Sequence, residues 1–143
     1  MIRTLFRPLA VFSLLLASTS MAGNGESRLF VTVTASGLQE QVMPLVLANQ
    51  AMDQGAEVRV LLCGAGAELA VESHQPETFA PRDITARDLL MRLIGNGHTA
   101  EVCAIFLPNT EYAPDDLVDG IGVADPADVA AWMMAPATRI LAQ

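Results

Sequence analysis

Residues 28–62, RLFVTVTASGLQEQVMPLVLANQAMDQGAEVRVLL, decide the fold class of this protein. Segment 28–34 mixes β-branched and apolar residues, which predicts a strand. Apolar residues then recur at roughly helical spacing up to Gly55, and residues 56–62 predict a second strand. A strand, a helix and a strand in this order predict a right-handed unit whose two strands are parallel.

The helix of this unit is predicted to begin at Ser36, because Gln39 three residues later completes the spacing of a capping box. Pro44 lies inside the predicted helix, where its ring and its missing N–H cost about 3 kcal/mol. We therefore expect the helix to bend near Pro44 or to begin late.

The rest of the chain continues the alternation of helices and strands. Residues 85–95 predict a helix whose first turn has a capping box formed by Thr85 and Asp88. Residues 98–107 predict a third strand, apolar nearly throughout, as expected for a strand covered on both faces. Asp125 is placed to cap a later helix. A short strand, that helix and a last strand are predicted at 121–124, 126–134 and 138–142. This alternation predicts an α/β domain with a mostly parallel sheet and helices on both faces.

The first 22 residues have the pattern of a secretory signal peptide. Two arginines precede an apolar run at 9–17, and Ser20 and Ala22 have the spacing of a cleavage site. The run is far shorter than the roughly 20 apolar residues that cross a bilayer as a helix. We therefore expect export, to the periplasm in a Gram-negative bacterium. The expected mature protein is a single domain of residues 23–143 without a stable membrane anchor.

The charge balance argues against a nucleic-acid partner. Without Arg3 and Arg7, six basic residues face sixteen acidic ones, and the sequence contains no lysine. Phosphate binding needs a basic surface, which this composition does not supply.

No cofactor or metal is expected from the motifs. The connection CGAGAEL, residues 63–69, can form a backbone nest for an anion, but it has neither a full G-x-G-x-x-G pattern nor the Gly-Lys-Ser/Thr of a P-loop. An ordinary turn is the simpler interpretation, and a ligand site there would require His74 to turn toward Cys63. The candidate metal ligands show no ligand spacing: Cys63, His74, His98 and Cys103.

Cys103 lies in the middle of the third predicted strand and has no local partner. His98 precedes it by five residues, which in an extended strand places the two about 16 Å apart and on opposite faces. Ligands gather outside the carboxyl ends of parallel strands. Cys103 reaches that edge if its strand ends near Ala104. If the strand continues to Leu107, Cys103 is a buried, inert core residue.

The stretches VCAIFLPN (102–109) and LVDGIGVADPADVAAWMMAPATRILAQ (117–143) resemble the DsrE/DsrF-like sulfur-relay family and its YchN-type members. The opening strand and turn LFVTVTASG (29–37) and the segment VRVLLCGAG (58–66) follow the same order, so the resemblance covers essentially the whole mature chain. It implies a three-layer α/β fold of about five strands and assembly into a homotrimer or homohexamer.

The resemblance also implies that sulfane sulfur is carried as a persulfide on Cys103, possible exchange with a thiol or persulfide protein partner, and sulfurtransferase-like sulfur carriage. The alternative is a non-catalytic oligomeric binding or scaffold protein that has the same fold. Exposure of Cys103 favours sulfur relay, and occlusion favours the scaffold. In such a fold we expect the first strand to lie beside the third, so the amides around Ser36 and Gly37 are candidates to stabilise the Cys103 anion. The same order places Cys63 and Cys103 about 9.6 Å apart, too far for a disulfide, and predicts two free thiols.

Overall fold

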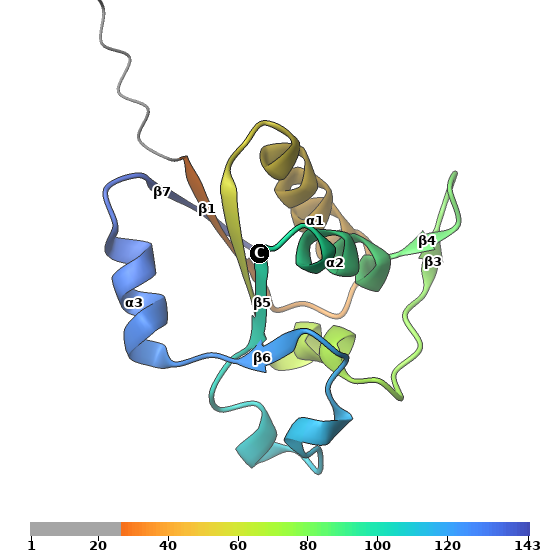
Figure 1. The fold of residues 1–143 in the computed structure, drawn as a ribbon. Coiled ribbons are helices and arrows are strands. Elements are labelled where there is room, and N and C mark those ends of the chain that lie inside the picture. The colour runs from red at the N-terminus through yellow and green to blue at the C-terminus, as the bar shows by residue number, and fades with distance from the viewer. Residues whose placement is uncertain (1–26) are drawn as a thin grey trace, which may run out of the picture.

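The computed structural model describes residues 27–143, so the predicted signal peptide lies outside the described residues. Within them, five parallel strands form one sheet in the order β6-β5-β2-β1-β7 (Figure 1). The strands are β1 (Arg28–Val33), β2 (Glu57–Leu62), β5 (Thr99–Val102), β6 (Ile121–Val123) and β7 (Thr138–Ala142). The predicted α/β class with a parallel sheet is confirmed, and β2 is its central strand.

Helices cover both faces of the sheet and make three layers. Helices α1 (Leu38–Asp53) and α2 (Ala86–Gly95) pack side by side on one face, and α3 (Pro126–Met134) lies on the other (Figure 1). The larger core lies beneath α1 and α2, and a smaller core beneath α3 is built on Phe30 and Val129. Among the described residues, no helix combines the length and apolarity needed to span a membrane.

Short elements fill the connections. They are the 3-10 helices η1 (Gly64–Ala70), η2 (Leu107–Asn109) and η3 (Pro114–Asp116), and the small hairpin β3 (Thr78–Phe79) and β4 (Ile84–Thr85). The hairpin precedes α2, whereas η2 and η3 lie between β5 and β6.

The caps of α2 and α3 are those predicted. The Thr85 hydroxyl accepts from the Asp88 N–H at 3.1 Å, and the Asp88 carboxylate accepts from the Thr85 N–H at 2.7 Å. Asp125 accepts from the N–H groups of Ala127 and Asp128 and so begins α3. Each cap satisfies backbone donors that the first turn of a helix leaves without partners.

The start of α1 differs from the prediction. The helix begins at Leu38, Gly37 is its N-cap in an extended conformation, and no side chain in residues 27–143 caps it. The Ser36 capping box is therefore wrong, and the N-cap lies one residue later, at the extended residue Gly37. Pro44 is tolerated inside the continuous helix, because the carbonyl that its missing N–H would have served belongs to the exposed residue Glu40.

Strand β5 is shorter than the apolar run that predicted it. It ends at Val102, and the Phe106 N–H donates to the Cys103 carbonyl at 2.9 Å, so the chain turns immediately after the strand. Phe106 is buried in the core from this turn, whereas Ile105 faces outward with 71% of its surface exposed. The apolar residues after Val102 are thus those of a buried turn, which a continuous strand pattern does not distinguish.

Candidate functional site

Two thiols lie at the carboxyl edge of the sheet, one residue beyond the ends of β2 and β5. Leu62 and Val102 are register partners at these ends, and the Cys103 N–H donates to the Leu62 carbonyl at 2.9 Å. Cys63 and Cys103 therefore continue the register of two adjacent strands, which are about 4.8 Å apart in a sheet. The predicted separation of about 9.6 Å is wrong, because β2 and not β1 borders β5. Both cysteines are free thiols in the structure.

A partly buried ion pair supports the contact between these two strands. Arg59 of β2 and Glu101 of β5 approach to 2.7 Å, and their side chains are 12% and 16% exposed. Arg59 lies three residues before Leu62 and Glu101 lies one residue before Val102, so the ion pair crosses the register diagonally. Paired, hydrogen-bonded charges of this kind favour one alignment of the strands.

Cys63 is held by backbone contacts with β1 and η1. Its N–H donates to the Val33 carbonyl at 3.0 Å, and its carbonyl accepts from the Gly66 N–H at 3.1 Å. A Cβ on Gly66 would overlap the Val33 carbonyl, so this position requires glycine. The Gly-rich connection is therefore explained by close packing of backbone on backbone, and it forms a 3-10 helix.

Cys103 lines a cavity of about 320 Å³ between the end of β5 and α3. The cavity walls are apolar and include Leu61, Ile105, Val129 and Met133. Because β5 ends before Cys103, the thiol is half-buried at the sheet edge and not enclosed in the middle of the sheet. Cys103 therefore lies at the carboxyl edge, as the sequence predicts for a strand that ends early.

The Cys63 thiol holds its proton strongly. Burial, followed by the hydrogen bond and the charge of the neighbouring Cys103 sulfur, raises the pKa of Cys63 from 9.0 to about 12. Cys63 therefore stays protonated at neutral pH, and its S–H is a hydrogen-bond donor beside the Cys103 sulfur.

The other residues considered from the sequence lie elsewhere. His98 precedes β5, and its Nδ1 accepts from the Val58 N–H at 3.2 Å, so its predicted place at the far end of the strand from Cys103 is confirmed. Ser36, Gly37 and His74 line a separate cavity of about 460 Å³. The prediction that the Ser36 and Gly37 amides lie beside Cys103 is wrong, because β2 separates β1 from β5. Within residues 27–143, no three His, Cys, Asp or Glu side chains are grouped as a metal site.

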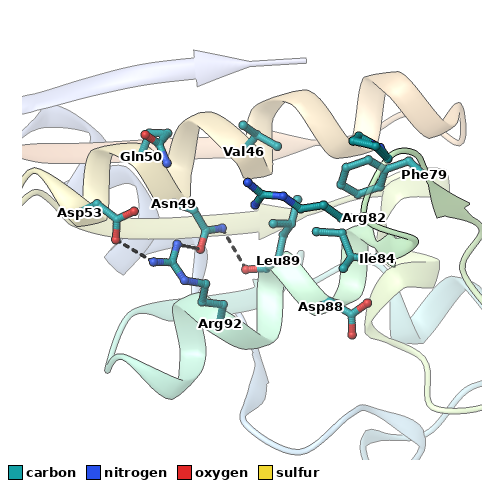
Figure 2. A pocket seen from close by; sticks show the side chains of 11 residues that line it. Val46, Asn49, Gln50, Asp53, Phe79, Arg82, Ile84, Asp88, Leu89 and Arg92 are labelled. Carbon is teal, nitrogen blue, oxygen red and sulfur yellow. Dashed lines mark hydrogen bonds and ion pairs between the residues drawn. The ribbon is translucent and has the colours of Figure 1, made fainter.

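A further cavity, of about 810 Å³, lies between α1, α2 and the hairpin (Figure 2). Three of its polar side chains are linked by hydrogen bonds: the amide of buried Asn49 donates to the Leu89 carbonyl, and Arg92 donates to Asn49 and to Asp53. Figure 2 shows this chain of contacts along the two helices. The groups satisfy the polar atoms of the helix interface.

Comparison with known proteins bears on the fold. No protein-family model matches the chain, and no curated protein matches it in sequence. Among solved structures, the ychN protein from E. coli aligns with a TM-score of 0.68 over 82% of this chain and 99% of that chain, at 15% identity. The chain has the YchN fold.

A second structure agrees with this assignment. MTH1491 from Methanobacterium thermoautotrophicum, a protein of unknown function, aligns with a TM-score of 0.62 at 12% identity, over 82% of this chain and 99% of that chain. The fold implied by the resemblance to the DsrE/DsrF-like family and its YchN-type members is therefore confirmed.

Within this YchN fold, the sequence indicates Cys103 as a candidate site residue but does not indicate its neighbour Cys63. Each cysteine directly follows a strand, which was the available signal for a shared edge. The prediction placed β1 between β2 and β5, and the observed strand order brings Cys63 into the site instead.

Proposed function

We propose that this protein binds sulfane sulfur as a persulfide on Cys103 and relays it to an acceptor thiol. The observation that carries the proposal is the end of β5 at Val102, which leaves Cys103 at the carboxyl edge of the sheet, lining an open apolar cavity. Ligands of parallel α/β sheets bind at this edge.

Sulfur transfer through Cys103 takes two steps, and each step uses only the Cys103 thiol of this protein. The Cys103 thiolate attacks the outer sulfur of a donor persulfide, a new S–S bond forms on Cys103, and the donor leaves as a thiolate. An acceptor thiolate then attacks the outer sulfur on Cys103, and Cys103 leaves as a thiolate. The two steps transfer one sulfur atom without a net change of oxidation state.

The surroundings of Cys103 suit both steps. The apolar cavity accommodates an uncharged or weakly hydrated sulfur better than a strongly hydrated anion. The protonated Cys63 beside it supplies an S–H donor to the anionic sulfur, in place of the amides around Ser36 and Gly37 that the sequence predicts for this role.

Exposed apolar side chains around the same edge support partners for the relay. Ile105, two residues after Cys103, is 71% exposed, and Val123, which pairs with Val102 at the end of β5, is 44% exposed. Such side chains gather at surfaces that contact other proteins. The proposal therefore includes a homotrimer or homohexamer and a thiol or persulfide protein that docks near Cys103.

A transfer experiment tests the function. The protein is mixed with glutathione persulfide whose outer sulfur is ³⁴S and with cysteine as acceptor, and labelled cysteine persulfide is trapped by alkylation and measured. The wild-type protein should accelerate transfer, and Cys103→Ser should return it to the uncatalysed rate. Cys63→Ser is the matched control, because it keeps Cys103, the thiol that carries the sulfur. Equal transfer by Cys103→Ser and wild type would overturn the proposal.

A further inference from the structure

Cys63 is the second thiol of the site, and its geometry relative to Cys103 is that of a pair able to react. Paired residues of parallel strands project to the same face of a sheet, and these two continue the register of Leu62 and Val102. A disulfide needs Cα atoms about 4.4–6.8 Å apart. The spacing of adjacent strands, about 4.8 Å, falls within that range.

The two thiols differ in their access to the cavity. Cys103 lines it, whereas Cys63 is not among the lining residues and is held by the backbone of β1 and η1. A donor molecule that enters the cavity therefore meets Cys103 first. Cys63 then lies within reach of any sulfur that Cys103 has accepted.

We propose that Cys63 is a resolving thiol that attacks the Cys103 persulfide, closes a Cys63–Cys103 disulfide and releases the carried sulfur as sulfide. This inference rests on the proposed function and adds a second fate for the sulfur carried on Cys103, which is release as sulfide. The protein would release sulfide when an acceptor thiol is absent and transfer sulfur when one is present.

The step balances within the site. The Cys63 sulfur bonds to the inner sulfur on Cys103, the bond from that sulfur to the outer sulfur breaks, and the outer sulfur leaves with the Cys63 proton as hydrogen sulfide. The sulfane sulfur gains two electrons, one from each cysteine sulfur. An external dithiol then reduces the disulfide and restores both thiols.

The environment of Cys63 sets the rate of this discharge. Only the thiolate attacks, and burial together with the Cys103 sulfur keeps Cys63 protonated at neutral pH. Among the described residues, Cys103 is the titratable group that acts on the Cys63 pKa. Discharge is therefore slow at neutral pH and accelerates as the pH rises, which leaves time for transfer to an acceptor.

The experiment loads the protein with glutathione persulfide, removes the donor, and follows intact mass and released sulfide without an acceptor. In the wild type, the adduct of about 32 Da should disappear with release of one sulfide per loaded chain, leaving a protein about 2 Da lighter than the dithiol. Compared per loaded chain, Cys63→Ser should keep the adduct and release sulfide at least roughly tenfold more slowly. Equal release by the two proteins would overturn the inference.

A second arm separates this inference from the proposed function. Diamide, a thiol oxidant, should convert the unloaded wild type to a species that yields one linked peptide containing Cys63 and Cys103. If Cys63→Ser and the wild type both load sulfur but diamide gives no linked peptide, the resolving role fails and the relay stands. If neither protein loads sulfur, the proposed function fails, whatever the result with diamide.

Discussion

Alkylation of Cys63 as a function of pH tests the electrostatics of the thiol pair. Thiolates and not thiols react with iodoacetamide. At pH 8, a thiol with the ordinary pKa of 9.0 is about one-tenth ionised, whereas a pKa of about 12 leaves about one molecule in 10,000 ionised. The folded protein should therefore alkylate Cys63 about 1,000-fold more slowly than an unfolded peptide of the same sequence.

The pH profile and one substitution sharpen this prediction. The rate at Cys63 should rise tenfold per pH unit through pH 9 and continue to rise toward pH 12. Cys103→Ser removes the hydrogen bond and the charge of the neighbouring sulfur, while burial, the largest cause of the raised pKa, persists. Cys63 should then react faster than in the wild type but still more slowly than in the peptide.

Peptide mass spectrometry after timed alkylation measures Cys63 and Cys103 separately. Circular dichroism at each pH checks that the protein stays folded, because an unfolded fraction would expose Cys63 regardless of its pKa. Reaction of Cys63 at the peptide's rate at pH 8, in folded wild-type protein, would refute the reasoning.

Three substitutions test the packing that positions the site. Gly66→Ala should lower the free energy of unfolding by about 1–3 kcal/mol in urea, because its Cβ displaces the Val33 carbonyl that binds Cys63; unchanged stability would contradict the close approach. Leu90→Ala, at a fully buried position of α2, should cost about 2–5 kcal/mol with an unchanged slope against urea, and a loss below 1 kcal/mol would show that the core is looser than described. Asp125→Ala should cost about 1 kcal/mol in the same assay, since two N–H groups of α3 lose their acceptor, and an equal cost for Asp125→Asn would argue against a capping role.

The fold was predictable from local chemistry where a motif satisfies particular backbone groups. The Thr85 and Asp88 capping box and the Asp125 cap placed α2 and α3 correctly, because these side chains bind the backbone N–H groups at the start of each helix. Ser36 has the same spacing with Gln39, but the chain remains extended through Gly37. A capping pattern alone does not show whether the preceding strand continues.

The site was less predictable, because it depends on which strands are neighbours. Sequence locates β1, β2 and β5 along the chain, but their order across the sheet is set by packing between distant segments. That order decides whether Cys63 lies beside Cys103. The sequence also did not show where β5 ends. Phe106 is buried although it lies in a turn, and a buried apolar residue is equally typical of a strand.

The most direct test of the central claim is the location of the sulfur that the protein accepts. Purified protein is incubated with glutathione persulfide, alkylated, and measured by intact mass and by peptide mass. The account predicts one added sulfur, about 32 Da, on the peptide that contains Cys103, present in Cys63→Ser and absent in Cys103→Ser. An adduct of the same yield in Cys103→Ser, or one found on Cys63 alone, would contradict it.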